Sequence, residues 1–126
     1  MDDAAVIPQK SGHDLVVTKD AIVEGVHFPS GEAPDLIARK LVRVNVSDLA
    51  AKGAEPFAAF LAVSWPAGYS ERDRAHFAMG LAADLEVFDM SLFGGDTTTT
   101  PGPFTCSLTA MGWTPAGRMV RRGGAR

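Results

Sequence analysis

The sequence is poor in cysteine, with Cys106 the single one among 126 residues. The chain therefore cannot form an internal disulfide or a zinc site built from several thiolates, and a reducing compartment, the cytoplasm, is the expected location. It also lacks an excess of positive charge: 12 Lys and Arg residues against 15 Asp and Glu residues give a formal net charge of −3. Because phosphate backbones select a basic face, a nucleic-acid partner is not expected.

Long apolar runs are missing as well. The longest run, residues 57–67, is broken by Ser64 and Pro66 and falls short of the roughly 18 residues of a membrane span, so no membrane association is expected. Hydrophobic residues still make up 46% of the chain, which argues against general disorder. At roughly 100–200 residues per domain, the chain is one domain or one piece of a longer protein. The basic, glycine-rich end at residues 118–126 favours a piece.

The periodicity of the apolar residues predicts the first half of the fold. Residues 15–18 and 22–28 are rich in β-branched side chains and are expected to form two strands. From residue 35 onward the period becomes helical, and Gly53 is a natural end for the helix. The apolar stripe of this helix consists of Ile37, Leu41, Val44 and Ala51.

The second half contains another helix, which Ser70 is expected to cap together with Asp73, three residues later. The predicted buried face of this helix carries Phe77, Leu81, Leu85 and Phe88. Further strands are predicted at residues 57–63, 91–93 and 104–113. This order of elements predicts an α+β fold, with a mixed or antiparallel sheet of about four strands and helices packed on one face.

Aspartates are the most informative residues of the sequence. Asp3 precedes a short apolar segment, Asp20 lies between two predicted strands, and Asp96 follows a predicted strand through two glycines. Any one of these could simply cap a turn. Asp48 instead continues the apolar stripe of the first helix, where an ionised carboxylate is costly unless a cation or a donor compensates it. Lys52, four residues later, could be that partner.

Carboxylates without a cluster of His and Cys favour Mg²⁺ or Ca²⁺ over zinc. Mg²⁺ held by scattered carboxylates usually takes further ligands from substrate phosphates, and Gly94 and Gly95 would let the backbone approach a phosphate. The sequence contains neither a Walker-type loop nor a dinucleotide-binding glycine motif. The residues alone leave two possibilities open: a metal-dependent phosphotransferase, or a non-catalytic module that dimerises through its sheet.

Seven motifs follow one another along the chain: Asp2-Asp3-Ala4-Ala5-Val6, Val17-Thr18-Lys19-Asp20, Val23-Glu24-Gly25-Val26-His27-Phe28, Val44-Asn45-Val46-Ser47-Asp48-Leu49-Ala50-Ala51, Gly53-Ala54-Glu55-Pro56, Gly94-Gly95-Asp96-Thr97 and Arg122 with Gly124-Ala125-Arg126. Together they resemble the N-terminal part of the thiamine-monophosphate kinase family. That family shares an ATP-using superfamily with aminoimidazole ribonucleotide synthetase, selenophosphate synthetase and a hydrogenase maturation protein.

The resemblance implies an activity: ATP and thiamine monophosphate give ADP and thiamine diphosphate, assisted by two or more Mg²⁺ ions. It also implies a homodimer that pairs through the sheets. Because the family carries a further C-terminal domain, residues 1–126 are expected to be the N-terminal ATP- and Mg²⁺-binding domain, lacking the first segment of the family. Lys19 departs from the Thr or Ser that the family usually has there.

The resemblance also implies roles for single residues. Metal ligands are expected at Asp3, Thr18, Asp20, Asp48 and Asp96. The nucleotide is expected to contact Gly95, Asp96 and Arg122, and the thiamine substrate is expected to face His27. Catalysis would be metal-assisted, with Asp48 and Asp96 the most critical residues. Another enzyme of the superfamily, acting in hydrogenase maturation, selenophosphate synthesis or purine synthesis, is the alternative, beside a non-catalytic dimerising fragment.

Overall fold

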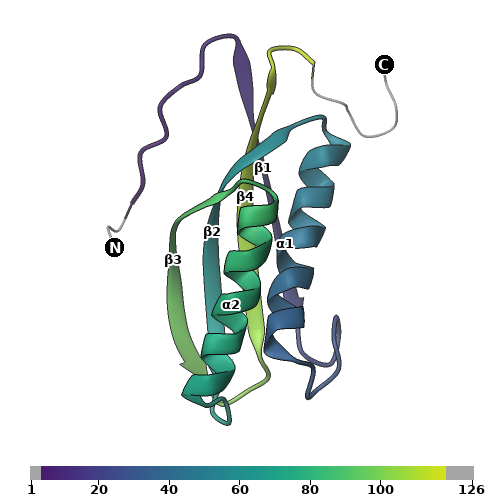
Figure 1. Cartoon of the computed structure of the whole chain (residues 1–126), viewed down its shortest axis with the longest axis vertical. Helices are drawn as coiled ribbons and strands as arrows, with labels where there is room; N and C mark the ends of the chain where they lie inside the picture. The colour runs from purple at the N-terminus through teal and green to yellow at the C-terminus, as the bar shows by residue number, and fades with distance from the viewer. Residues whose placement is uncertain (1–3, 119–126) are drawn as a thin grey trace.

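The computed structural model describes residues 4–118, which form four strands and two helices (Figure 1). In chain order these are β1 His13–Val23, α1 Pro34–Ala51, β2 Glu55–Pro66, α2 Glu71–Val87, β3 Ser91–Thr100 and β4 Thr105–Pro115. No helix in this part of the chain is both long and apolar enough to cross a membrane.

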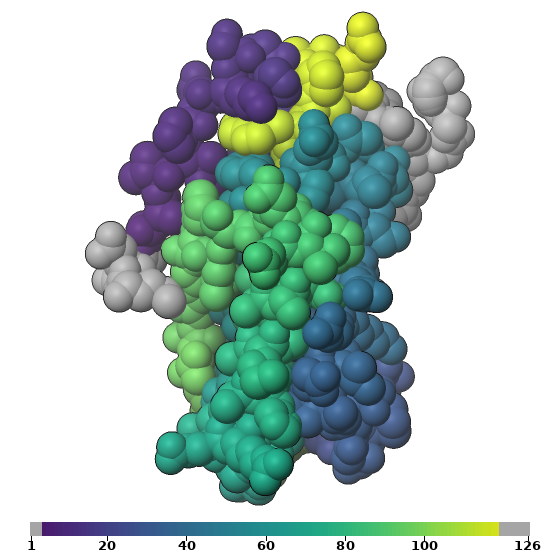
Figure 2. All heavy atoms as spheres, in the orientation of Figure 1, coloured from purple at the N-terminus to yellow at the C-terminus, as the bar shows by residue number. Residues whose placement is uncertain are grey.

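The four strands form one mixed sheet in the order β1-β4-β2-β3. β4 is antiparallel to both β1 and β2, whereas β2 and β3 are parallel and are joined through α2. Both helices lie on the same face of the sheet, and the space-filling view shows them covering the front of the molecule with β3 at the left edge (Figures 1 and 2). The predicted α+β class is confirmed.

The two strands predicted at residues 15–18 and 22–28 are in fact one strand. Asp20 does not interrupt it, because β1 stays paired with β4 throughout and Asp20 lies opposite Leu108. The strand ends at Val23, whose carbonyl oxygen accepts hydrogen bonds from the N–H groups of Val26 and His27. Residues 24–28 therefore form a turn, and Gly25 takes a positive φ of 86° within it.

The strand predicted at residues 91–93 is also longer than expected. β3 continues through Gly94, Gly95 and Asp96 to Thr100, parallel to β2, with Asp96 opposite Ala62. The run from Thr97 to Thr100 belongs to this strand, because β-branched residues suit an edge strand whose outer side faces water. A Cβ atom at Gly95 would lie 2.1 Å from the carbonyl oxygen of Leu61, so the close approach of β2 requires glycine here.

The positions of the two helices agree with the sequence prediction, although Ala51, expected on the apolar stripe of the first helix, is exposed at its end. Ser70 and Asp73 cap α2 reciprocally: the Ser70 Oγ accepts from the Asp73 N–H at 3.1 Å and an Asp73 carboxylate oxygen accepts from the Ser70 N–H at 2.9 Å. The helices pack closely, since a Cβ at Gly80 of α2 would lie 2.4 Å from the Asp35 carbonyl oxygen of α1. An ion pair also joins them, because the fully buried Asp84 carboxylate accepts from Arg43 Nε at 2.8 Å.

The core lies between the helices and the sheet and is centred on Phe104, which is 1% exposed. Its ring stacks on Trp65, with centroids 5.4 Å apart, and meets Phe77 edge-on at 5.7 Å. Cys106, on the same side of β4, is buried, and this burial raises the pKa of its thiol to about 12. The thiol is therefore an inert packing group in the folded chain.

The opposite face of the sheet, here called the open face, is not covered by either helix. Leu15 and Val17 point to it from β1 and are 42% and 56% exposed, whereas Val16 between them points into the core. The apolar side chains on the open face include Leu15, Val17, Phe57, Phe60, Phe93 and Trp113. One end of the face is therefore an uncovered aromatic and aliphatic patch.

Candidate functional site

Two of the predicted metal ligands, Asp20 and Asp48, meet beside the edge strand β1. Asp20 lies on the side of β1 that faces the helices, and Asp48 lies near the end of α1, which packs along β1. A hydrogen bond with the Asp48 carboxyl group raises the pKa of Asp20, and partial burial and the charge of Asp48 raise it further, against a smaller lowering by His27. Two carboxyl groups this close repel one another when both are ionised, and a cation bound between them would relieve that repulsion.

The placement of Asp48 differs from the sequence prediction. It was expected on the buried stripe of the helix, but its side chain is exposed, and Asn45 and Leu49 point into the core instead. The reason is that β1 is an edge strand, so this flank of α1 projects past the sheet into solvent. Lys52 is not its partner: in residues 4–118 the ion pairs join Asp84 to two arginines.

An open hollow of about 580 Å³ lies at this carboxyl pair and is called the α1 hollow here. Its walls come from β1, the turn that follows it and one flank of α1. The lining residues are Asp20, Ala21, His27, Lys40, Arg43, Val44, Ser47 and Asp48. Sequence reasoning missed Lys40 and Arg43, although these two residues are three apart and Lys40 is four residues before Val44, spacings that place side chains on one side of a helix. The hollow thus combines carboxylate side chains, which can bind a cation, with basic side chains, which can bind an anion.

His27 lies on the turn after β1 and lines the same hollow. Its Nδ1 accepts a hydrogen bond from the Val23 N–H at 3.0 Å, so this ring nitrogen is occupied by the backbone. Lys40 Nζ donates to the carbonyl oxygen of His27 from the first half of α1. The imidazole is therefore held in place by its own turn and by the helix.

Asp96 is not close to the carboxyl pair within one chain. It lies on β3, the opposite edge of the sheet, and shares the open face with Ala62, whereas Asp20 faces the helices. Three strand spacings separate β1 from β3, or about 14 Å. One Asp96 oxygen accepts from the Thr97 N–H at 3.1 Å. Within residues 4–118 no three or more His, Cys, Asp and Glu side chains gather into a site that could hold a metal ion.

The remaining predicted site residues are spread out. Thr18 is half-buried on the same side of β1 as Asp20, two residues earlier, and does not line the α1 hollow. Gly95 lies on β3 beside Asp96, where its close contact with β2 gives a packing reason for glycine. Asp3 and Arg122 fall outside the residues that the structure describes. Of the predicted site residues, Asp20, Asp48 and His27 thus lie together within one chain, around the α1 hollow.

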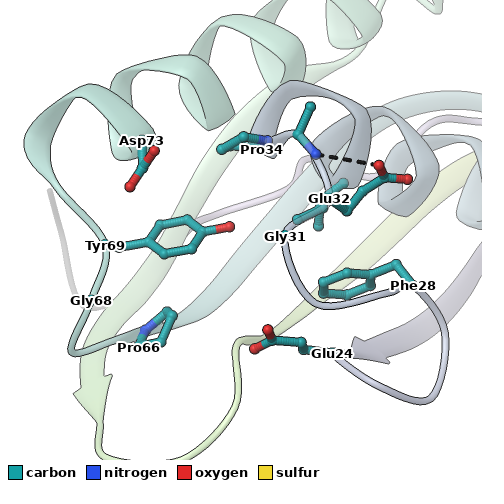
Figure 3. Close-up of a pocket in the computed structure, with 11 residues that line it drawn as sticks. Glu24, Phe28, Gly31, Glu32, Pro34, Pro66, Gly68, Tyr69 and Asp73 are labelled. Atoms are coloured by element: carbon teal, nitrogen blue, oxygen red, sulfur yellow. Dashed lines mark hydrogen bonds between the residues drawn. The ribbon is translucent and has the colours of Figure 1, made fainter.

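A second cavity, of about 400 Å³, lies at the start of α1 and was not foreseen (Figure 3). The ring of Tyr69 projects across it toward Gly31, and Glu24, Glu32 and Asp73 place carboxylates around its wall (Figure 3). Burial, with the charges of Asp73 and Glu24, raises the pKa of Tyr69 to about 12, so the phenol stays protonated. All three acids already accept hydrogen bonds from backbone N–H groups: Glu24 from Phe104 at 2.9 Å, Glu32 from Ala33 at 3.3 Å (Figure 3), and Asp73 from Ser70 at the cap of α2.

Comparison with known proteins identifies the class. The family model for AIR synthase related protein, N-terminal domain, matches residues 1–114, and the chain belongs to this family. It is 57% identical over its whole length to thiamine-monophosphate kinase of Caulobacter vibrioides and 38% identical to that of Escherichia coli K12. The chain spans 36% and 38% of the length of these two relatives.

Solved structures agree with this similarity. Thiamine-monophosphate kinase from Stenotrophomonas maltophilia K279a superposes with a TM-score of 0.86 at 43% identity, over 96% of this chain and 37% of that one. AaThiL complexed with AMPPCP and TMP superposes with a TM-score of 0.85 at 28% identity, over 94% of this chain and 38% of that one. Escherichia coli HypE, a hydrogenase maturation protein, has a TM-score of 0.77 at 17% identity, which shows a shared fold alone.

Proposed function

We propose that residues 1–126 are the N-terminal ATP- and Mg²⁺-binding domain of a cytoplasmic thiamine-monophosphate kinase, which transfers the terminal phosphoryl group of ATP to thiamine monophosphate. The observation that carries this proposal is the Asp20–Asp48 carboxyl pair beside His27 in the α1 hollow. The similarity to named thiamine-monophosphate kinases, over the whole chain in the case of the Caulobacter relative, supports the choice of substrate. The distant likeness to HypE supports only the fold, so another superfamily activity has no comparable support.

The chemistry of the hollow suits this reaction. The acceptor is a phosphate that is already ionised at neutral pH, so no side chain has to remove a proton from it. Phosphoryl transfer then depends mainly on positioning and on neutralising negative charge. His27 fits this view, because its Nδ1 is occupied by the Val23 N–H and the ring is oriented rather than free to accept a proton there. Lys40 adds positive charge at the rim, whereas the guanidinium of Arg43, which also lines the hollow, is paired with Asp84.

The carboxyl pair is also a suitable partner for Mg²⁺. Asp20 and Asp48 supply hard oxygen donors from two different elements. The pKa of Asp20 is raised first by its hydrogen bond with Asp48 and further by burial and by the charge of Asp48, a repulsion that a divalent cation would relieve. The proposed metal ligands are Asp3, Thr18, Asp20, Asp48 and Asp96. When bound, Mg²⁺ neutralises charge on the phosphates of the donor and the acceptor. Gly95, Asp96 and Arg122 are proposed to contact the nucleotide, and His27 the thiamine substrate.

The activity can be tested by joining this chain to the C-terminal part of the Caulobacter relative, in place of the 36% of that protein which it matches. We call this fusion the extended enzyme. Thiamine diphosphate, followed by chromatography, is expected to form only with ATP, thiamine monophosphate and Mg²⁺ all present, and a chelator is expected to stop it. A folded fusion that makes no thiamine diphosphate would contradict the proposal.

The non-catalytic alternative is addressed with the chain alone. The melting temperature is measured at increasing concentrations of a Mg²⁺-nucleotide. It is expected to rise, because a ligand that binds the folded state stabilises it. The rise is expected to shrink as the pH is lowered, since a proton on the Asp20–Asp48 pair competes with the cation. A rise in Tm that survives a chelator would contradict a metal-dependent site.

We also propose that two copies pair through the open face to form a homodimer. The patch around Phe60, Phe93 and Trp113 is uncovered, and the edges β1 and β3 are unpaired within the described chain. If two such sheets close on each other edge to edge, β3 of one copy comes next to β1 of the other. The proposed dimer would thus place the strand that carries Asp96 in one copy beside the strand that carries Asp20 in its partner, one strand spacing away instead of three.

Mixing two inactive variants tests this arrangement. Extended enzymes carrying Asp48→Asn and Asp96→Asn are co-expressed with different tags, and the mixed dimers are purified through both. One of the two sites in each mixed dimer would then keep both aspartates, so about half of the wild-type activity is expected. If both aspartates of a site came from one chain, every site would carry a substitution and the mixed dimers would stay inactive.

A further inference from the structure

The turn at residues 24–28 is fastened to the rest of the fold at several points. The Glu24 carboxylate accepts from the Phe104 N–H at 2.9 Å, and the Gly25 N–H donates to the Phe28 carbonyl oxygen at 2.7 Å. The Phe28 ring is buried against Phe104, with centroids 5.9 Å apart. These contacts hold the two ends of the turn to the sheet and the core, and they leave His27, between them, exposed at the α1 hollow.

The hydrogen bond inside this turn determines which ring nitrogen of His27 carries the proton. Nδ1 accepts from the Val23 N–H at 3.0 Å, so in the neutral imidazole the proton resides on Nε2. The ring nitrogen left for a ligand is therefore a donor. A donor suits an anionic oxygen, such as that of a phosphate.

Lys40 joins the exposed part of the turn to α1. Its ammonium group donates to the carbonyl oxygen of His27, the same residue whose ring lines the hollow. Because a hydrogen bond from a charged donor is stronger than a neutral one, this contact restrains the peptide that carries the imidazole. Lys40 comes from the helix that also supplies Asp48, so it links the position of the imidazole to that of the carboxyl pair.

We infer that Lys40 is a positioning residue, which holds the turn so that His27 donates its Nε2–H to an anionic oxygen of the phosphate-bearing substrate. This inference rests on the proposed function and adds to it the direction of the hydrogen bond and the residue that fixes it. The role of His27 is then to orient and bind the acceptor substrate. Lys40 acts through His27 and does not need to touch the substrate.

The first test compares three variants of the extended enzyme. Lys40→Met is expected to raise KM for thiamine monophosphate about tenfold while kcat changes less than about twofold, because a binding group is misplaced and the reacting groups are untouched. Lys40→Arg retains a donor and is expected to recover most of the affinity. Lys52→Met, at the end of the same helix, is the matched control and is expected to behave as wild type. An unchanged KM in Lys40→Met would overturn the inference.

The second test concerns the direction of the hydrogen bond. In His27→Gln the amide nitrogen can reach the place of Nε2 and donate, whereas in His27→Asn the amide oxygen can replace only the Nδ1 acceptor. His27→Gln is expected to keep KM for thiamine monophosphate within about fivefold of wild type, and His27→Asn to raise it at least about tenfold further. Equal losses in both variants would overturn the donor role. If the unmodified extended enzyme itself made no thiamine diphosphate, the proposed function would fall first.

Discussion

Replacing Asp48 by asparagine in the extended enzyme is expected to lower kcat for thiamine-monophosphate phosphorylation by roughly 1,000-fold, and Asp96→Asn is expected to do the same. Asparagine keeps the size of the side chain but not its charge, so a divalent cation loses an anionic ligand. For Asp48 the substitution also removes one of the two charges of its carboxyl pair with Asp20. The measurement is the initial rate of thiamine diphosphate formation at saturating ATP and Mg²⁺.

The fold is expected to survive this substitution. Asp48 is exposed, and removing its charge relieves repulsion with Asp20, so the Tm of the metal-free protein is expected to stay unchanged or to rise. Asp89→Asn is the matched control, because Asp89 lies away from the α1 hollow and its positive φ of 55° suits asparagine. Rates near wild type in both Asp48→Asn and Asp96→Asn would count decisively against the proposed site.

Phe104→Ala is expected to lower the free energy of unfolding of the chain by about 3–5 kcal/mol, the largest effect on stability of any single substitution considered. The Phe104 side chain is 1% exposed and touches the rings of Trp65, Phe77, Tyr69 and Phe28, so truncation leaves a cavity with rings on several sides. Urea denaturation followed by tryptophan fluorescence measures the change, and Trp65 is a direct reporter of it.

A conservative variant separates packing from other effects. Phe104→Leu keeps most of the buried volume and is expected to cost less than about 2 kcal/mol. Both variants keep the backbone N–H that donates to Glu24, so neither removes that hydrogen bond. A loss below about 1 kcal/mol in Phe104→Ala would show that the core can collapse around the site, and the central role assigned to this ring would be wrong.

The helices could be predicted from the sequence because their signals are local. Ser70 and Asp73 cap α2 as expected, and Gly53 follows the end of α1 with a positive φ of 74°. The limits of β1 and β3 could not be predicted, because they depend on partners far along the chain. Thr97 to Thr100 belong to a strand only because β2, more than thirty positions earlier, lies alongside them. The buried ion pair of Asp84 is non-local in the same way.

The candidate site was predictable in its chemistry but not in its geometry. Carboxylates and the family motifs indicated which residues matter, and Asp20 and Asp48 do meet. Their meeting requires α1 to pack along the edge strand, which no local pattern specifies. The same edge position explains why Asp48 faces solvent instead of the core. Asp96 sits at the far edge for a similar reason, since the sheet order β1-β4-β2-β3 cannot be read from the order of the strands in the chain.

The buried thiol of Cys106 can report how often the chain unfolds. Its thiol lies in β4 at the middle of the sheet, and burial suppresses the thiolate that alkylating reagents attack. Cys106 is the single cysteine in the sequence. Alkylation of the protein at neutral pH therefore requires an opening in which β4 separates from its neighbouring strands. The rate of thiol alkylation thus measures how often the sheet opens, without an engineered probe.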